Sequence, residues 1–240
     1  MASPGATVNR QLPLPLPGGD ADSLFALPAR LAFPVATEGG SPFDDDERFF
    51  EPWWPGAHAF LRRSGPQVEL RTEHLSDPLA AFPELRGIVS RLSADGVIVE
   101  GTLLALDQEG RPDARLLRRR LTGAGPADEV AEGAFVASDL AWLEGRALGR
   151  QPFVERRRRL TSVLRDSEHC VVSRGLVGEG VTLANAVASL GLRAISARRL
   201  DGRWRSGPSG DDWLRLPVRE APSTPTRPFL VLLEKLPLGD

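Results

Sequence analysis

The run of residues from Val97 to Leu106 constrains the fold more than any other segment of the chain. It follows Gly96, and apart from the Glu-Gly-Thr step at 100–102 it contains only Val, Ile, Leu and Ala. A strand with so few polar positions is typical of the buried middle of a sheet, where both faces are covered. The composition, with 41% hydrophobic and 26% charged residues, is that of an ordinary globular protein able to bury such a strand.

Shorter runs with strand or helix character alternate on both sides of this segment. The β-prone runs are 58–63 and 67–71, which predict a hairpin, and 134–142, 192–198 and 213–218. The predicted helices are 79–92, a segment capped by Asp113, a segment opened by Pro152, and 179–190, which follows a turn at 176–177 and is ended by Gly191. This mixed order predicts an α+β fold with antiparallel sheets packed by helices, not a doubly wound fold.

The two ends of the chain differ in composition from the middle. Residues 1–27 are rich in proline and glycine and predict an irregular arm, residues 28–218 form the predicted domain, and residues 219–240 form a tail with one predicted edge strand at 229–233. The sequence contains no run of 18 apolar residues, and prolines interrupt the N-terminal segment where a signal peptide would be apolar. We expect a soluble, cytoplasmic protein with no membrane partner.

Residue counts exclude several kinds of chemistry. The single cysteine, Cys170, cannot form an intramolecular disulfide, and the three histidines do not complete a Cys/His zinc cluster, so we expect no metal. His169 is adjacent to Cys170, but the sequence offers no third partner for a catalytic cysteine pair. Only one of the 30 basic residues is a lysine, Lys235, and arginine does not lose its proton to become a nucleophile. Lysine-based covalent chemistry is therefore nearly excluded.

Eight segments of the chain resemble the motifs of a known family. They are FEPWWPGAH at 50–58, FPEL at 82–85, VEGTL at 99–103, DQEGRPD at 107–113, FVASDL at 135–140, ERR at 155–157, GL at 191–192 and DWLR at 212–215. In this order and spacing they resemble the adenylation domain of ATP-dependent DNA ligases, of the bacterial ligase D type, over residues 28–218. The resemblance implies a nucleotidyltransferase fold related to ATP-grasp enzymes, with ATP and Mg²⁺ as cofactors and duplex DNA as substrate.

The first of these segments departs from the family's nucleophile motif. In the family, the lysine of Lys-x-Asp-Gly-x-Arg attacks the α-phosphate of ATP. Here the lysine position is Trp53, the aspartate is Pro55, the glycine is kept as Gly56, and the arginine is His58. An indole has no lone pair available for phosphoryl attack, so the resemblance implies that the enzyme cannot be adenylated at this position.

Other positions of the implied nucleotide pocket have changed as well. Thr102 occupies the position of the glutamate in the family's Asp-Gly-Glu. Ser138 occupies the position of the aromatic residue that stacks on adenine in the family. The family's Glu-Gly-Val-Val-x-Lys begins at Arg193, so carboxylates that Mg²⁺ requires are missing. The vestigial pocket implied by the resemblance comprises Glu51, Trp53, Pro55, Gly56, His58, Glu100, Thr102, Ser138, Arg193, Arg198 and Arg215. We expect neither ATP nor Mg²⁺ to be used.

Two interpretations remain open for several side chains of this pocket. Arg193, Arg198 and Arg215 either hold an anion without a metal or pair with the many Asp and Glu residues of the chain. One of Trp53 and Trp54 either fills the vacated pocket as part of the core or stacks on a nucleic-acid base.

Three groups of arginines are candidates for DNA contact, although arginines on surface helices are usually only solvated. They are Arg118, Arg119 and Arg120; Arg156 and Arg157; and Arg203 and Arg205. We predict a catalytically inactive pseudo-ligase, without an OB-fold, that binds DNA nicks or ends or a DNA-repair protein. The alternatives are an active ligase or nucleotidyltransferase with a displaced nucleophile, and a protein-interaction scaffold.

Overall fold

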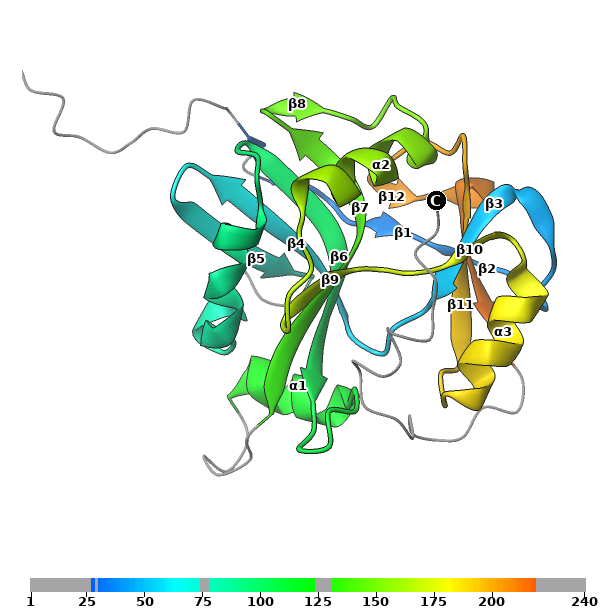
Figure 1. Cartoon of the computed structure of the whole chain (residues 1–240), viewed down its shortest axis with the longest axis horizontal. Coiled ribbons are helices and arrows are strands. Elements are labelled where there is room, and N and C mark those ends of the chain that lie inside the picture. Colours follow the sequence, from blue (N-terminus) through cyan, green and yellow to red (C-terminus); the bar gives the residue numbers. More distant parts are fainter. Residues whose placement is uncertain (1–26, 29, 74–77, 124–130, 219–240) are drawn as a thin grey trace, which may run out of the picture.

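Two sheets form the body of the protein, with a small number of helices around them (Figure 1). In this computed structural model of the 240-residue chain, residues 27–28, 30–73, 78–123 and 131–218 are described. The predicted arm at 1–27, apart from Leu27, and the predicted tail at 219–240 lie outside the described residues. None of the helices in the described ranges has the length and hydropathy needed to cross a bilayer.

The larger sheet has six strands and contains the predicted central strand. Its order is β5-β4-β6-β7-β8, and β9 pairs in parallel with β7. The strands are β4 (Ala57–Ser64), β5 (Gln67–Thr72), β6 (Val97–Leu106), β7 (Glu132–Leu143), β8 (Arg146–Ala147) and β9 (Cys170–Val172). The β4–β5 hairpin and the place of β6 between β4 and β7 confirm both predictions.

The second sheet has five strands, in the order β10-β3-β11-β13-β2. They are β2 (Thr37–Glu38), β3 (Asp45–Pro52), β10 (Leu176–Gly178), β11 (Ala194–Arg199) and β13 (Trp213–Pro217), and a separate pair is formed by β1 (Pro34–Val35) and β12 (Gly207–Pro208). The turn predicted at 176–177 is wrong, because these residues pair with β3 as strand β10. Strand β3 itself was not predicted, since its first half is acidic and its second half is fully buried, and neither half alternates.

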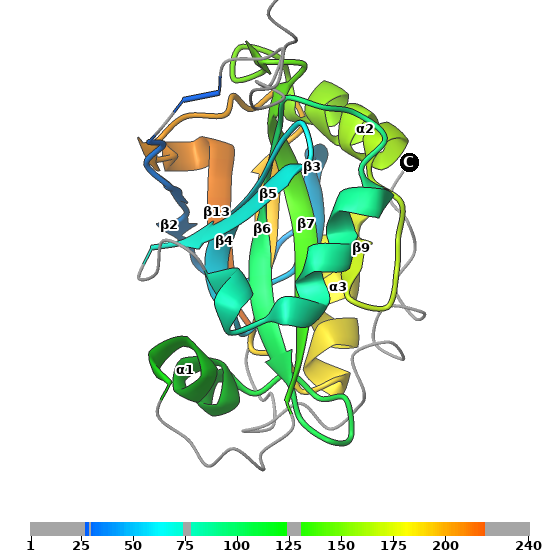
Figure 2. The same ribbon diagram turned by 90° about the vertical axis from the view of Figure 1, so that its left-hand side faces the viewer.

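Three α-helices match the predicted segments. They are α1 (Ala114–Thr122), α2 (Phe153–Val163) and α3 (Gly180–Ser189). The Asp113 carboxylate caps α1 by accepting hydrogen bonds from the backbone N–H groups of Arg115 and Leu116, at 2.6 and 3.2 Å. Helix α2 packs against β7 of the larger sheet (Figure 2), and its first residue, Phe153, also lies against Phe49 of β3, with ring centroids 5.9 Å apart.

The α-helix predicted at 79–92 is wrong in type. The segment forms two 3₁₀ helices, η1 (Pro78–Ala80) and η2 (Pro83–Arg91), and a third short one, η3 (Gly210–Asp212), precedes β13. The buried residues Leu79, Phe82, Leu85 and Ile88 recur every three residues. A 3₁₀ helix has three residues per turn, so this spacing puts Leu85 and Ile88 on one face of η2, and all four side chains belong to the same core cluster.

Alternation along β6 places a pocket between the two sheets. Val99 and Leu103 face the cluster that packs under η2 and α1, whereas Leu104 and Leu106 face the cluster shared with the second sheet and α3. Glu100 falls on the second face, so its carboxylate points into the space between the sheets. The α+β class with mainly antiparallel sheets is confirmed.

Candidate functional site

Eight of the eleven residues predicted for the vestigial pocket line one cavity of about 270 Å³ between the two sheets. They are Glu51, Trp53, Gly56, His58, Glu100, Thr102, Ser138 and Arg198. The other three, Pro55, Arg193 and Arg215, line a neighbouring hollow that also includes Trp53. The structure therefore brings these eight residues together, and several of their polar side chains interact with one another.

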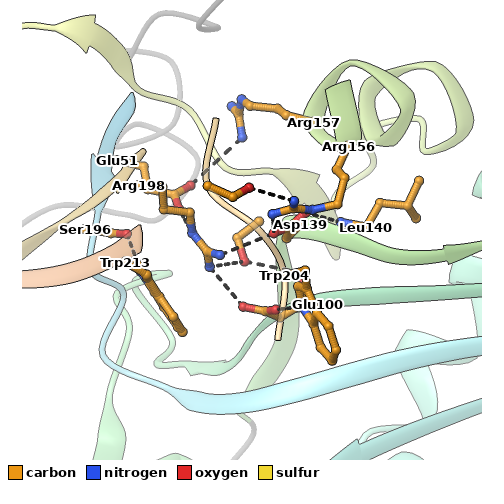
Figure 3. Close-up of polar contacts among 12 residues, drawn as sticks. Glu51, Glu100, Asp139, Leu140, Arg156, Arg157, Ser196, Arg198, Trp204 and Trp213 are labelled. Atoms are coloured by element: carbon orange, nitrogen blue, oxygen red, sulfur yellow. Dashed lines mark hydrogen bonds and ion pairs between the residues drawn. The ribbon is translucent and has the colours of Figure 1, made fainter. Parts of the chain in front are cut away.

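Arg198, on β11, is the centre of an ion-pair cluster at this cavity (Figure 3). Its Nε lies 3.2 Å from Glu51 Oε1, its Nη2 lies 2.9 Å from Glu100 Oε1, and its Nη1 lies 3.4 Å from Asp139 Oδ2. The guanidinium carbon also lies 4.0 Å from the centroid of the Trp213 ring. Burial opposes the charge, but the three carboxylates together raise the pKa of Arg198 above its ordinary value.

Glu100, on β6, accepts contacts from both sheets and from a loop. Trp204 Nε1 donates to its Oε2, and His58 Nε2 lies 3.3 Å from its Oε1 without hydrogen-bond geometry. Burial favours the neutral acid, but Arg198 and then His58 outweigh it and lower the pKa of Glu100 to about 2. The carboxylate is therefore ionised at neutral pH and is already engaged by three side chains.

Arg156 is buried against Asp139 rather than exposed on the helix surface. Its Nε and Nη2 donate to the two carboxylate oxygens of Asp139 at 2.8 and 2.7 Å, which is a bidentate pair. Its Nη1 donates to the carbonyls of Gln151 and Gly202, and the residue is 2% exposed. Prediction of Arg156 as a surface contact for DNA is therefore wrong.

Arg157 is also buried, at 5% exposure, so its prediction as a surface contact is wrong for the same reason. Its Nη2 donates to the carbonyl of Ser173, and its guanidinium lies 4.0 Å above the Phe49 ring. Its Nη1 is 4.0 Å from Glu51 Oε2, and neither atom has a hydrogen-bond partner among the described residues. Both arginines face inward because they follow Phe153 by three and four residues on α2.

The two tryptophans in the segment that resembles the family's nucleophile motif differ in environment. Trp54 is 5% exposed and belongs to the core cluster with Leu104 and Leu192. Trp53 is half-buried, stacks on Trp213 with ring centroids 5.7 Å apart, and lies 5.4 Å from the Arg215 guanidinium. The cavity remains open beside them, so the core interpretation fits Trp54 and neither indole fills the pocket.

Gly56 is the one residue of the nucleophile motif that is kept, and packing accounts for it. A Cβ atom at this position would lie 2.3 Å from the carbonyl oxygen of Leu103 and 2.5 Å from Thr102 Cγ2. Real Cβ atoms do not approach backbone that closely, so only glycine lets β4 begin against β6. Packing alone therefore explains why glycine occupies this position, without a bound nucleotide.

No family model matches the chain, but curated relatives do. It is 24% identical over 195 residues to the multifunctional non-homologous end joining protein LigD of Mycolicibacterium smegmatis, covering 81% of this chain and 24% of that protein. It is 30% identical over 163 residues to LigD of Pseudomonas aeruginosa, covering 67% of this chain and 19% of the relative. It is 27% identical over 179 residues to the DNA ligase of Thermococcus fumicolans, covering 71% of this chain and 32% of that ligase. The chain thus spans no more than about a third of these three relatives.

Solved structures agree with these relatives. The mycobacterial DNA ligase D complexed with ATP and MES matches with a TM-score of 0.65 and 26% identity, covering 78% of this chain and 60% of that chain. The ligase domain of M. tuberculosis LigD matches with a TM-score of 0.63 and 25% identity, covering 77% of this chain and 58% of that domain's chain. This chain is a relative of the adenylation domain of LigD-type, ATP-dependent DNA ligases.

The pocket of this ligase relative does not fit ATP and Mg²⁺. Its two deepest carboxylates, Glu51 and Glu100, are bound to the Arg198 guanidinium, which repels a divalent cation. The described residues contain no group of three or more His, Cys, Asp or Glu side chains arranged for a metal. Ser138 Oγ lies 3.4 Å from the carbonyl of Glu100 and offers no ring on which adenine can stack. Arg198 and Arg215 pair with carboxylates, Arg215 with Glu38 at 3.0 Å, as the second interpretation predicts.

Two groups of exposed arginines in this ligase relative are candidates for DNA contact. The α1 cluster consists of Arg115, Arg118 and Arg119, whereas Arg120 turns inward to Glu84 at 2.8 Å and to the ring of Phe82. The β8 cluster joins the predicted Arg203 and Arg205 to two residues that sequence reasoning missed, Arg146 and Arg150. Two hydrogen bonds join the segment after β8 to the loop that carries Arg203 and Arg205. The backbone N–H of Trp204 donates to the carbonyl of Gly149, and the Arg203 side chain donates to the carbonyl of Arg150.

Proposed function

We propose that this chain is a catalytically inactive ligase-like domain that binds duplex DNA at nicks or ends. The observation that carries the proposal is the pocket itself. At the position of the family's nucleophile stands Trp53, and the adjacent carboxylates are neutralised by Arg198, a side chain of the same molecule. The described residues contain no lysine, and the one lysine of the chain, Lys235, lies outside them. A displaced nucleophile is therefore the less favoured alternative.

The two arginine clusters support a DNA-binding surface. Strand β7 begins near α1, where its Glu132 pairs with the end of β6, and its other end pairs with β8. Helix α1 and strand β8, which carry most of the two clusters, consequently lie at opposite ends of the larger sheet (Figure 1). A duplex that contacts both clusters would meet up to seven guanidinium groups, a number sufficient for salt-dependent phosphate binding.

The names of the relatives support the choice of nicks or ends. The LigD proteins are named for non-homologous end joining, and the archaeal relative is named as a DNA ligase. Both activities act where a duplex is interrupted. A domain that has lost the adenylation chemistry and kept the family's shape is best explained by retained recognition of such an interruption.

A fluorescence-polarisation titration tests this proposal. Fluorescent nicked, blunt-ended and circular intact duplexes are titrated with the protein at several salt concentrations. We expect the nicked or end-bearing duplex to bind most tightly, with log K falling linearly against log salt at about 0.9 per phosphate contacted. No binding to any of the three near physiological salt would overturn DNA recognition and leave a protein-interaction scaffold.

Matched variants locate the surface. Arg115→Gln, Arg118→Gln and Arg119→Gln together remove the α1 cluster, and we expect the salt slope to decrease by up to about 3. Arg86→Gln and Arg91→Gln remove two exposed arginines of η2 that belong to neither cluster. This double variant serves as the control. If it lowers the salt slope as much as the α1 variant does, DNA is attracted by charge alone and not by a particular surface.

A further inference from the structure

The hollow beside the vestigial pocket, here called the Trp53 hollow, has a volume of about 210 Å³. The described residues that line it are Trp53, Pro55, Gly191, Leu192, Arg193, Ala194 and Arg215. The N–H of Trp53 donates to the carbonyl of Ala194 at 3.0 Å, which holds the chain after β3 against the start of β11. The Trp53 hollow therefore lies between that chain and the turn that follows α3.

The indole of Trp53 separates this hollow from the vestigial pocket. Trp213 stacks on the indole with ring centroids 5.7 Å apart, and it lines the vestigial pocket but not the Trp53 hollow. Arg215 lines the Trp53 hollow but not the pocket, with its guanidinium 5.4 Å from the centroid of the indole. Trp53 is half-buried, so part of its ring is reachable from solvent. An indole held in place by Trp213 and still reachable is a platform on which another planar ring can stack.

Both charged side chains that line the Trp53 hollow are arginines. Arg193 is exposed at its mouth. Arg215 pairs with Glu38 at 3.0 Å, but the Glu38 side chain is 68% exposed, and such surface pairs contribute little to stability. A phosphate could therefore replace Glu38 on Arg215 at small cost, and it would gain bidentate hydrogen bonds from the guanidinium.

The volume of the Trp53 hollow limits what can enter it. Sites for drug-sized ligands usually measure about 300–1000 Å³, so a space of about 210 Å³ suits one planar ring system and not a whole nucleotide. A base stacked on Trp53 would leave its sugar and phosphate at the mouth, beside the two arginines. Bases inside a duplex are covered on both faces by their neighbours, so only an unpaired base can reach the indole.

We propose that the Trp53 hollow binds an unpaired nucleotide of a DNA strand, with the base on the Trp53 indole and a phosphate on Arg193 or Arg215. The choice of DNA rests on the proposed function, and the inference deepens that function by naming the feature that is recognised. Gaps, flaps and overhangs supply unpaired nucleotides, whereas a simple nick or a blunt end does not. Stacking on an aromatic ring tolerates every base, so the site should have little sequence preference.

Binding of two short single strands tests the site without any duplex. The probes are fluorescent hexathymidylate and a fluorescent hexamer in which every residue is an abasic tetrahydrofuran, titrated with the full chain by fluorescence polarisation at low salt. The two strands carry the same charge and differ only in their bases. We expect hexathymidylate to bind at least about fivefold more tightly, because stacking of one base on an aromatic side chain typically contributes that factor. Equal affinities, or no measurable binding of hexathymidylate, would overturn the proposal.

The same titration separates this site from the proposed function. Preference for hexathymidylate in a protein that binds no duplex would support the Trp53 hollow and overturn only the recognition of nicks or ends. Duplex binding without a preference between the two single strands would overturn the Trp53 hollow and leave the proposed function standing.

Variants assign the preference to Trp53. Trp53→Ala should reduce it to within about twofold, and Trp53→Phe, which keeps a smaller ring, should retain part of it, so the site stays testable if Trp53→Ala does not fold. Arg193→Gln together with Arg215→Gln should weaken both strands alike, because phosphates and not bases are contacted. Trp142→Phe is the control, because this half-buried tryptophan of β7 lines neither space and should leave the preference unchanged. A preference that is unchanged in both Trp53 variants, or that Trp142→Phe lowers equally, would contradict the proposal.

Discussion

Arg198 Nη2 lies 2.9 Å from Glu100 Oε1, and this ion pair joins the two sheets of the protein. Arg198 belongs to β11 of the five-stranded sheet and Glu100 to β6 of the six-stranded sheet. In the resemblance described above, these positions are the lysine of Glu-Gly-Val-Val-x-Lys and the aspartate of Asp-Gly-Glu. Here the two side chains neutralise each other, so loss of either one would leave an unpaired charge at the buried centre of the pocket.

Arg198→Met should be strongly destabilising. It leaves Glu51 and Glu100 buried without their main cation, and removal of one partner of a buried ion pair typically costs about 3–5 kcal/mol. Denaturant unfolding at neutral pH measures the loss. Arg215→Met is the control, because its pair with Glu38 is largely exposed and should contribute no more than about 1 kcal/mol. Similar losses in the two variants would contradict the central place of Arg198.

Stability should fall in acid partly through Glu100. A glutamate whose pKa is lowered on folding stabilises the native state above its unfolded pKa, near 4.5, and that stabilisation is lost as the pH falls toward about 2. The free energy of unfolding should therefore decrease across this interval in the wild type. In Glu100→Gln the decrease should be smaller, although that variant is less stable at neutral pH. Identical pH slopes for the two proteins would show that Glu100 is not the titrating group.

Cys170 should be protected from thiol reagents in the native protein. It is fully buried on β9, and burial together with Asp166 raises the pKa of its thiol, so the reactive thiolate is scarce. We expect reaction with 5,5′-dithiobis(2-nitrobenzoic acid) to be slower than in denaturant by at least about a thousandfold, since exposure requires unfolding. The sequence has no second cysteine, so rapid labelling without denaturant would show directly that β9 is not packed as described.

Gly56→Ala should destabilise the protein without any nucleotide present. Its new methyl group would meet the backbone oxygen of Leu103, and relief of such overpacking typically costs about 1–3 kcal/mol. Gly87→Ala is the matched control, because a Cβ there meets nothing within 4 Å, and its effect should stay within about 0.5 kcal/mol. Thermal melts of both variants compare them. A neutral Gly56→Ala would mean that the glycine is a relic of the motif rather than a packing requirement.

Local signals in the sequence were sufficient for much of the fold. The β4–β5 hairpin, the buried strand β6 and the Asp113 cap of α1 each follow from neighbouring residues, and all three are confirmed. Strand β3 escaped prediction because its burial comes from β10, β11 and α3, which lie more than a hundred residues later in the chain. Apolar residues in segment 79–92 recur every three positions, a period that suits the observed 3₁₀ helices better than the predicted α-helix.

The candidate site was predictable in place but not in its contacts. Motif spacing located the pocket residues, since eight of them line one cavity. It did not reveal that Arg156 and Arg157 turn inward, although their distance from Phe153 and Leu160 on α2 puts them on the buried helical face. Their partners Asp139 and Ser173 come from β7 and the segment after β9. Such long-range pairings cannot be read from local periodicity.

Intact-protein mass spectrometry after incubation with ATP and Mg²⁺ shows whether any residue of the chain can be adenylated. The unmodified chain and a Trp53→Lys/Pro55→Asp variant, which restores the lysine and aspartate of the family motif, are compared with the same samples lacking ATP. We predict that the unmodified chain shows no covalent AMP, and that the variant shows none either, because Arg198 still engages Glu51 and Glu100. A stoichiometric AMP adduct on the unmodified chain would contradict the account and establish an active nucleotidyltransferase with a displaced nucleophile.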